Sequence, residues 1–245
     1  DVVKQLLYNR GIKGKNDIEE FLNPDFSKLH DPYKMHGIKE AVQRIKRASE
    51  GNEKVGIFAD YDADGIPGAA FLAKVFREIG IKYKTYIPNR EDGYGLSKKG
   101  IDYLISERCS LIVTVDLGIR NIEETKYCNE KNIDLIITDH HTLGEELPEA
   151  DILINPKILK DKYPFRELSG GGVVFKLAQA LGEEFPKIDE RFLKWNLDLV
   201  AISTITDVVP LIDENRILAK FGLIVLSKTK NIGLQELYKA ASIKQ

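Results

Sequence analysis

Short apolar runs that alternate with amphipathic stretches dominate the middle of this sequence. The apolar runs lie at 55–58, 83–87, 111–115 and 135–138, and they are rich in β-branched and aromatic residues. Between them, residues 68–79, 98–107 and 121–132 have the apolar spacing of helices. Strands that alternate with helices form a mostly parallel sheet covered by helices on both faces. The alternation therefore predicts an α/β fold, with a short fifth strand at 152–154.

The two ends of the chain have helical patterns without strand-like runs. In residues 1–50 the apolar positions recur at helical spacing in three pieces, which predicts an N-terminal helical cap. The same spacing returns in the last third of the chain, at 173–181, 192–204, 215–226 and 234–241. We therefore predict a helical cap at 1–50, an α/β domain at 51–165 and a helical part at 166–245.

Composition excludes several classes of protein. No apolar run approaches the ~20 residues of a membrane-spanning helix, and the N-terminus has neither a start methionine nor a secretory signal, so we expect a trimmed, cytoplasmic chain. Cys109 and Cys128 are too few for a disulfide framework or a zinc site and are expected to be buried fillers. The net charge of −2 offers no general surface for a polyanion. A polyanion site must be local, or completed by residues outside this chain.

Acidic residues and histidines follow three of the predicted strands. The carboxyl ends of parallel strands line one edge of a sheet, so we expect these side chains to converge there. Converging carboxylates repel one another unless a cation neutralises them, and carboxylate with imidazole suits Mn²⁺, or Mg²⁺ as a substitute. The donors exceed the needs of one octahedral ion, which favours two ions. The residues are Asp60, Asp62 and Asp64 after the first strand, Asp116 after the third, and Asp139, His140 and His141 after the fourth.

Each of these segments also has a simpler interpretation. Residues 60–65 have the opening spacing of a calcium-binding EF-hand loop, but Phe71 stands where that loop needs a glutamate. The same residues suit a solvated acidic turn, and Asp116 with Gly118 suits an ordinary strand exit. A single histidine is more often a satisfied surface or core residue than a ligand. The coincidence of several such groups at one sheet edge favours the metal site.

Eight short motifs of this sequence are informative together. They are Asp60-Tyr61-Asp62-Ala63-Asp64-Gly65, Ile87-Pro88-Asn89-Arg90, Gly93-Tyr94-Gly95, Val115-Asp116-Leu117-Gly118, Asp139-His140-His141, Ile154-Asn155-Pro156, Ser169-Gly170-Gly171-Gly172 and Thr206-Asp207-Val208-Val209-Pro210-Leu211. Together they resemble the motifs of the DHH phosphoesterase superfamily and, within it, the RecJ-type single-strand-specific exonucleases. The resemblance implies that Asp62, Asp64, Asp116, His140 and Asp207 bind the ions, with Asp116 bridging them and His141 facing the substrate phosphate.

The resemblance also implies an activity and partners. It implies two-metal hydrolysis of single-stranded DNA, or RNA, in the 5′ to 3′ direction, with a role in DNA repair and recombination. It further implies a C-terminal DHH-associated domain that this sequence lacks, and partnership with a single-strand-binding protein or replication proteins. Two positions depart from the usual pattern, Ala59 in place of glycine and Leu117 in place of cysteine or asparagine.

Two related functions remain as alternatives. Superfamily members that act on short oligonucleotides or cyclic dinucleotides usually have a histidine and an Asn-Pro pair before the aspartates, where this chain has Phe58 and Asp60-Tyr61. A non-catalytic replication scaffold of the same superfamily loses ligands, whereas every expected ligand is present here.

Other residues suit the handling of a phosphodiester. His141 would donate a proton to the leaving oxygen or hydrogen-bond the phosphate, and Asp60 would orient ligands or water. The planar fork of Arg90 suits a phosphate, although an arginine after a strand is often only a surface residue. Tyr94 would stack on a base. The loop Ser169, Gly170, Gly171 and Gly172 leads into a predicted helix, where backbone N–H groups would bind a phosphate, unless the glycines only form a turn.

Overall fold

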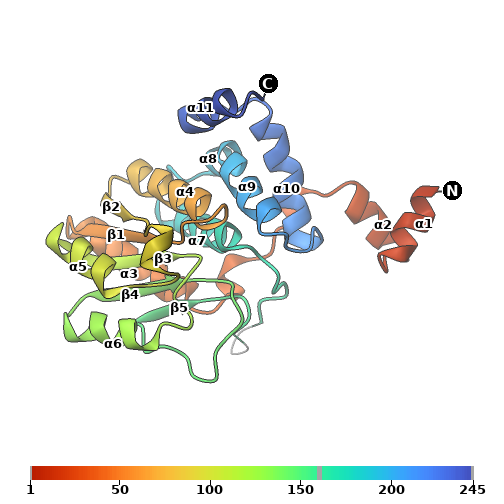
Figure 1. Cartoon of the computed structure of the whole chain (residues 1–245). Coiled ribbons are helices and arrows are strands. Elements are labelled where there is room, and N and C mark those ends of the chain that lie inside the picture. Colours follow the sequence, from red (N-terminus) through yellow and green to blue (C-terminus); the bar gives the residue numbers. More distant parts are fainter. Residues whose placement is uncertain (1, 159–161, 244–245) are drawn as a thin grey trace.

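A five-stranded, wholly parallel sheet forms the centre of the computed structural model, which describes residues 2–158 and 162–243 (Figure 1). The strand order is β2-β1-β3-β4-β5, so the predicted α/β fold with a parallel sheet is confirmed. The strands are β1 (Lys54–Ala59), β2 (Lys82–Tyr86), β3 (Cys109–Val115), β4 (Asp134–Thr138) and β5 (Ile152–Ile154).

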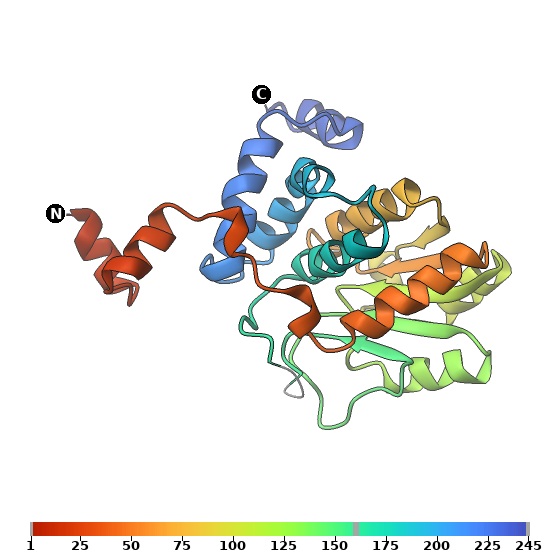
Figure 2. The same cartoon turned by 180° about the vertical axis from the view of Figure 1, so that it is seen from behind.

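Helices cover both faces of this sheet. On one face lie α3 (Ile38–Glu50), α4 (Gly65–Glu78) and α7 (Gly170–Glu184). Figure 2, the view from behind, shows α3 in front of the sheet. On the other face lie α5 (Lys98–Ser106) and α6 (Ile122–Glu130). Strand β3 shows the division, because Leu111 and Val113 belong to the first core and Ile112 to the second. Cys109 and Cys128 are free and buried in the second core, as predicted.

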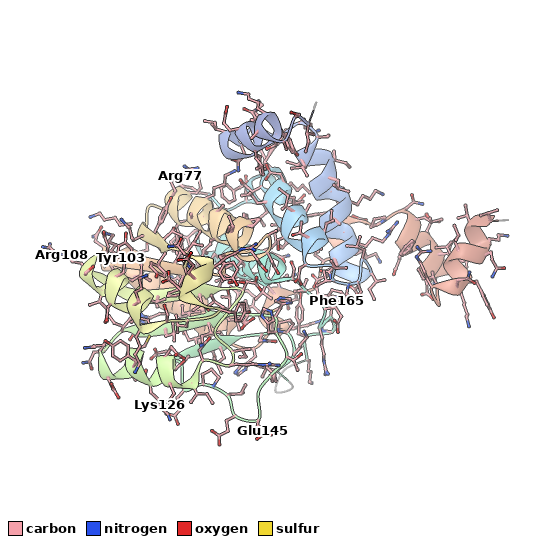
Figure 3. All side chains as sticks on the ribbon, viewed as in Figure 1. Arg77, Tyr103, Arg108, Lys126, Glu145 and Phe165 are labelled. Atoms are coloured by element: carbon pink, nitrogen blue, oxygen red, sulfur yellow. The ribbon has the colours of Figure 1, made fainter. Side chains whose placement is uncertain are left out.

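Charged side chains lie around the outside of this body. Arg77 at the end of α4, Arg108 before β3 and Lys126 on α6 are exposed and point away from the sheet (Figure 3). In the described part of the chain, no helix is both long and apolar enough to span a bilayer. The central strands are apolar along almost their whole length, as strands covered on both faces should be.

The two ends of the chain are helical, as the apolar spacing indicated. Helices α1 (Val2–Asn9) and α2 (Lys15–Leu22) project from the body, and two 3-10 turns, Phe26–Lys28 and Pro32–Lys34, connect them to α3 (Figure 1). The C-terminal part contains α8 (Glu190–Trp195), α9 (Leu197–Thr206), α10 (Asp213–Leu226) and α11 (Ile232–Ala240). The division into parts at residues 50 and 165 stays a prediction.

One predicted helix is two helices in the structure. The apolar spacing at 192–204 indicated a single helix, but α8 ends at Trp195 and α9 begins at Leu197. The side chain of Asn196 donates to the carbonyl oxygen of Phe192 at 2.8 Å and accepts from Lys74 Nζ at 2.8 Å. Asparagine side chains compete in this way with helical hydrogen bonds, which explains the break.

A buried ion pair connects the N-terminal segment to the helices behind the sheet. Lys176 on α7 and Glu214 on α10 have fully buried side chains, with Nζ 2.9 Å from Oε1. Lys176 Nζ also donates to the carbonyl oxygen of His30 at 2.5 Å, and the backbone N–H of His30 donates to Glu214 at 3.0 Å. Tyr163 donates its hydroxyl to the same carboxylate. The chain before α3 is thereby held against α7 and α10.

Candidate metal centre

The sheet ladder continues into the turns that carry the acidic residues. The backbone N–H of Asp60 donates to Val115 of the next strand at 3.2 Å, that of Asp116 to Thr138 at 3.0 Å, and that of Asp139 to Ile154 at 3.0 Å. Each residue that follows a strand is therefore fixed by the strand beside it. The parallel register aligns the carboxyl ends of these strands at one edge of the sheet, as the sequence predicted.

Seven side chains meet at this edge, and we call them the ligand cluster. They form three groups whose potential ligand atoms lie within 4.8 Å of one another. Asp207, at the C-terminal end of α9, reaches the cluster from the helical part of the chain. All five predicted metal ligands are brought together. The groups are Asp60, Asp62 and Asp116; Asp64, His140 and Asp207; and Asp116, His140 and His141.

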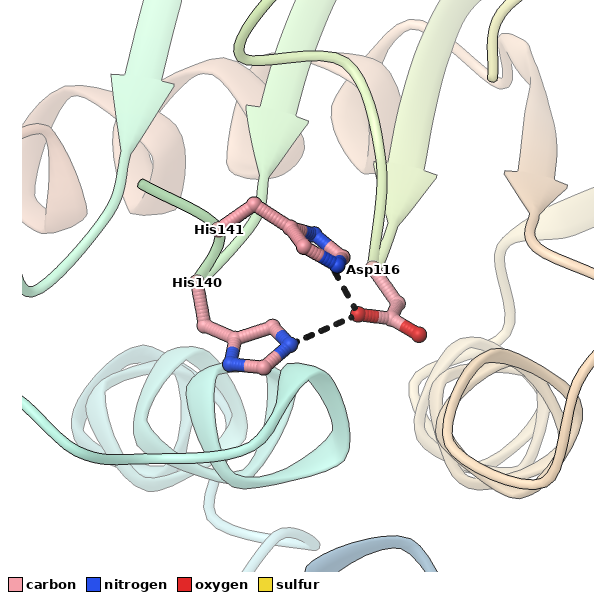
Figure 4. A group of neighbouring side chains, drawn as sticks. All are labelled: Asp116, His140 and His141. Carbon is pink, nitrogen blue, oxygen red and sulfur yellow. Dashed lines mark ion pairs between the residues drawn. The ribbon is translucent and has the colours of Figure 1, made fainter. Parts of the chain in front are cut away.

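His140 lies at the centre of the ligand cluster. Its Nε2 is 3.1 Å from Asp116 Oδ1 and 3.6 Å from both Asp64 Oδ2 and Asp207 Oδ2. Figure 4 shows the rings of His140 and His141 directed at the same oxygen of Asp116, to which His141 Nδ1 is 3.9 Å. Asp116 thus lies between two of the groups, as a bridging ligand would.

Three atoms of the ligand cluster have no hydrogen-bond partner although they are buried. They are Asp60 Oδ1, Asp116 Oδ1 and His140 Nε2, and in the described residues only Asn215 Oδ1 shares this condition. A buried polar atom without a partner costs about 1–3 kcal/mol. Two carboxylate oxygens and one imidazole nitrogen that converge without donors suit a divalent cation such as Mn²⁺ or Mg²⁺.

Burial raises the pKa values of three carboxyl groups in the ligand cluster. Burial, followed by the charges of Asp64 and Asp62, raises the pKa of Asp116 to about 10. Burial also raises the pKa of Asp60, with a further contribution from Asp62. It raises the pKa of Asp207 as well, although His140 opposes the shift. Protein groups alone therefore disfavour full ionisation here, and a cation would reverse that preference.

The turn after β3 holds Asp116 in a left-handed backbone conformation. Its φ is +63°, which aspartate tolerates better than most residues do, and Gly118 follows at φ +117°. Gly170, at the start of α7, lies against this turn, because a Cβ atom there would be 2.5 Å from Asp116 Cβ. The glycine thus permits α7 to approach the candidate bridging ligand.

The first turn of α7, which begins at Gly170 after the N-cap residue Ser169, binds a carboxylate of the chain itself. The backbone N–H groups of Gly170 and Gly171 donate to Asp64 at 2.7 and 2.8 Å, and that of Gly172 donates to Ser169 Oγ at 3.1 Å. These donors, expected to bind a substrate phosphate, are buried and already have acceptors. The helix N-terminus still binds an anion, but that anion is Asp64.

Ser203 is a member of this arrangement that sequence reasoning missed. Its hydroxyl donates to Asp64 and lies 2.9 Å from Ser169 Oγ. Ser203 is fully buried on α9, 139 positions from Asp64 along the chain. No local pattern distinguishes it from other helical serines.

Comparison with known proteins agrees with this geometry. Residues 54–204 match the family model described as the N-terminal domain of the DHH family. The chain belongs to the DHH family. This matched stretch contains every member of the ligand cluster except Asp207.

Curated relatives and solved structures of the DHH family are similar over most of this chain. The single-stranded-DNA-specific exonuclease RecJ of Bacillus subtilis is 42% identical over 239 residues, which cover 97% of this chain and 30% of that protein. RecJ of Escherichia coli is 34% identical, with 91% and 40% covered. The chain therefore spans less than half the length of these relatives.

Two crystal structures give the same comparison in three dimensions. Exonuclease RecJ bound to manganese has a TM-score of 0.77 and 31% identity, over 88% of this chain and 54% of that one. RecJ of Thermus thermophilus in complex with Mn²⁺ has a TM-score of 0.79 and 29% identity, over 97% of this chain and 33% of that one.

Asp139, the first residue of the family's Asp-His-His turn, orients the second histidine. Its Oδ1 is 2.7 Å from His141 Nδ1 and accepts the backbone N–H groups of His140 and His141, while Oδ2 accepts from Ile119. Burial opposes ionisation of Asp139, but the hydrogen bonds and the charge of His141 lower its pKa. The same contact raises the pKa of His141, whose side chain is 41% exposed.

The two predicted substrate-binding residues after β2 have different positions. The Tyr94 hydroxyl lies 3.2 Å from His141 Nε2, on a segment between Gly93 and Gly95, which both have positive φ. Tyr94 is 58% exposed, and its hydroxyl also lies 3.5 Å from the carbonyl oxygen of Asp116. The Arg90 guanidinium instead lies over the ring of Tyr61, 5.7 Å from its centroid. The structure therefore places the Tyr94 hydroxyl against the ligand cluster, whereas the Arg90 side chain contacts Tyr61 instead.

Proposed function

We propose that this chain is the catalytic core of a metal-dependent phosphodiesterase, a RecJ-type exonuclease that degrades single-stranded DNA from the 5′ end. The observation that carries the proposal is the gathering of seven acidic and histidine side chains into three groups, in which Asp60 Oδ1, Asp116 Oδ1 and His140 Nε2 are buried and make no hydrogen bond. The names of the relatives supply the substrate class. We also propose a role in DNA repair and recombination, which the family resemblance implies.

Two Mn²⁺ or Mg²⁺ ions fit the ligand cluster. Asp64, His140 and Asp207 would hold one ion, and Asp62 with Asp60 would hold the other, with Asp116 between the two groups. Asp60, which the sequence suggested would orient ligands, has an unpartnered oxygen inside a ligand group. A direct contact with the ion therefore suits Asp60 better than an orienting role.

The residues around the ions would bind the substrate and move protons. When bound, the ions supply Lewis acidity at the scissile phosphate and lower the pKa of the attacking water. With His141 Nδ1 directed at Asp139, its Nε2, which faces the Tyr94 hydroxyl, would act on the phosphate or the leaving oxygen. The hydrogen bond to Asp139 fixes the orientation of that ring. We further propose that Tyr94, whose hydroxyl lies beside that nitrogen, contacts the terminal nucleotide.

Strand binding and cell location complete the proposal. The net charge of −2 and the greater length of the relatives suggest that much of the DNA contact lies outside residues 1–245. A DHH-associated domain and a single-strand-binding protein are the partners we expect, in the cytoplasm. RNA is the alternative substrate.

Hydrolysis assays would test the proposal. A 5′-labelled single-stranded oligonucleotide and a dinucleotide are incubated with the chain and Mn²⁺, Mg²⁺ or chelator, beside Asp116→Asn as the matched control. Metal-dependent release of 5′ mononucleotide by the wild type alone supports the exonuclease. Cleavage of only the dinucleotide favours a phosphodiesterase of short substrates. Metal binding without any cleavage favours the non-catalytic scaffold.

A further inference from the structure

The segment after β5 contacts the Asp-His-His turn from the side opposite β3. Thr138 of β4 pairs with Ile154 of β5, so Asn155 leaves the sheet directly beside Asp139. Asn155 is 1% exposed and directly follows the short strand β5 at the edge of the sheet. The proposed chemistry assigns no role to the sequence motif Ile154-Asn155-Pro156. The burial of Asn155 beside the two histidines suggests that it has a role in the site.

Two side chains of this segment bind the backbone carbonyls of the two histidines. Asn155 Nδ2 donates to the carbonyl oxygen of His141 at 3.0 Å, and Lys157 Nζ donates to that of His140 at 2.6 Å. Asn155 Oδ1 accepts the backbone N–H of Lys157 at 2.9 Å, which connects the two donors. The contacts are separate, one for each histidine.

These contacts complement those made by Asp139. The Asp139 carboxylate holds the backbone N–H groups of both histidines and the ring of His141. Asn155 and Lys157 hold the carbonyl groups of the same two residues. The peptide units of the turn are therefore restrained on both their donor and their acceptor sides. A turn that loses one side can rotate, and its imidazole rings move with it.

We infer that Asn155 and Lys157 are positioning residues with divided tasks, Asn155 for His141 and Lys157 for His140. This rests on the proposed function, in which His140 binds an ion and His141 faces the phosphate. Loss of the Asn155 contact should then impair turnover, whereas loss of the Lys157 contact should impair metal binding. A purely structural role would not separate these two effects.

The chain offers variants that isolate each donor. Asn155→Asp keeps the oxygen that accepts from Lys157 N–H but replaces the Nδ2 donor, and Lys157→Met keeps the length of the side chain without its ammonium group. Lys157→Arg retains a cationic donor and should recover part of any loss. Asn129→Ala is the matched control for asparagine, because its Nδ2 donates to the Glu149 carbonyl at 3.0 Å on the surface. Lys54→Met, which removes a contact to Glu107, is the control for lysine.

Three measurements distinguish the tasks: Mn²⁺ affinity by calorimetry, kcat and KM on a single-stranded oligonucleotide, and ¹⁵N NMR signals of the histidine rings in the metal-free chain. We expect Asn155→Asp to lower kcat about 10- to 100-fold with little change in KM or Mn²⁺ affinity, since small displacements of a catalytic group have large effects. We expect Lys157→Met to weaken Mn²⁺ binding about 10- to 100-fold. The ring signals of His141 and His140, respectively, should shift.

The inference fails if both variants bind Mn²⁺ and turn over as the two controls do, or if both lose the two properties in equal proportion. It also fails if the histidine ring signals match those of the wild type. If the wild-type chain cleaves no DNA, the proposed function fails, while the NMR and Mn²⁺ measurements still decide whether the two side chains position the histidines.

Discussion

Asp116→Asn should stabilise the metal-free protein, although it removes the candidate bridging ligand. In the folded chain burial raises the pKa of Asp116 to about 10, whereas the carboxyl of an unfolded chain has its ordinary pKa of about 4. The unfolded state therefore ionises first as pH rises, and stability falls between these two pH values. At about 1.4 kcal/mol per pH unit, the loss reaches about 4 kcal/mol at pH 7.

The amide variant removes this loss without changing the shape of the side chain. Asparagine also tolerates the left-handed backbone at this position, where φ is +63°. Urea unfolding in chelator at pH 6, 7, 8 and 9 should show wild-type stability declining relative to Asp116→Asn across the series. Saturating Mn²⁺ should reverse the order at pH 6 and 7, because each of the two ions, at 100 times its Kd, adds about 2.7 kcal/mol, or about 5 kcal/mol together.

Asp139→Asn is the contrasting control. The pKa of Asp139 is lowered in the fold, so its contribution is present above the unfolded pKa and disappears as pH falls through the folded pKa. That variant should be less stable than the wild type at neutral pH. If the curves for the wild type and Asp116→Asn remain parallel from pH 6 to 9 in chelator, the account of a strained carboxylate at Asp116 is refuted.

Three further predictions follow from individual contacts. Gly170→Ala should weaken Mn²⁺ binding more than tenfold in calorimetry, because the added Cβ atom would lie 2.5 Å from Asp116. Gly172→Ala should leave Mn²⁺ binding unchanged, because the nearest atom to its added Cβ would be 3.3 Å away. Lys176→Met should cost about 3–5 kcal/mol in urea unfolding by leaving Glu214 buried without its partner, and Glu214→Leu in the same chain should recover part of it. Val208→Gly should stabilise the folded chain by about 1–2 kcal/mol, since Val208 is 85% exposed and its φ of +60° is a strained backbone conformation for valine. An unchanged midpoint of urea unfolding would contradict this account.

The sheet and the place of the site follow from local patterns. A buried parallel strand such as β3 needs only a continuous apolar run, which is visible in residues 111–115. Parallel strands then place their exits at one edge, so Asp60, Asp116 and His140 converge without further information. Asp207 could be assigned only by resemblance, because it lies at a helix end that has no such pattern.

The features that sequence reasoning missed depend on contacts between distant segments. Asp64 takes the N–H groups of Gly170 and Gly171, more than 100 residues further along the chain. The glycines were correctly placed at a helix start, but the anion there is a side chain of the protein itself. The break at Asn196 likewise depends on Lys74, which a helical spacing pattern does not include. Composition and periodicity predict local helices and strands, but they do not identify hydrogen-bond partners that lie far apart in the sequence.

Asp207 is the last member of the ligand cluster along the chain, and it reaches the others from α9 rather than from a strand exit. Chains are synthesised from the N-terminus, so the sheet can assemble before α9 has left the ribosome. The group of Asp64, His140 and Asp207 then lacks one carboxylate. If this chain is the nuclease proposed above, this order of events is protective, because a nascent chain near nucleic acid would gain its full set of ligands only after its helical part has docked.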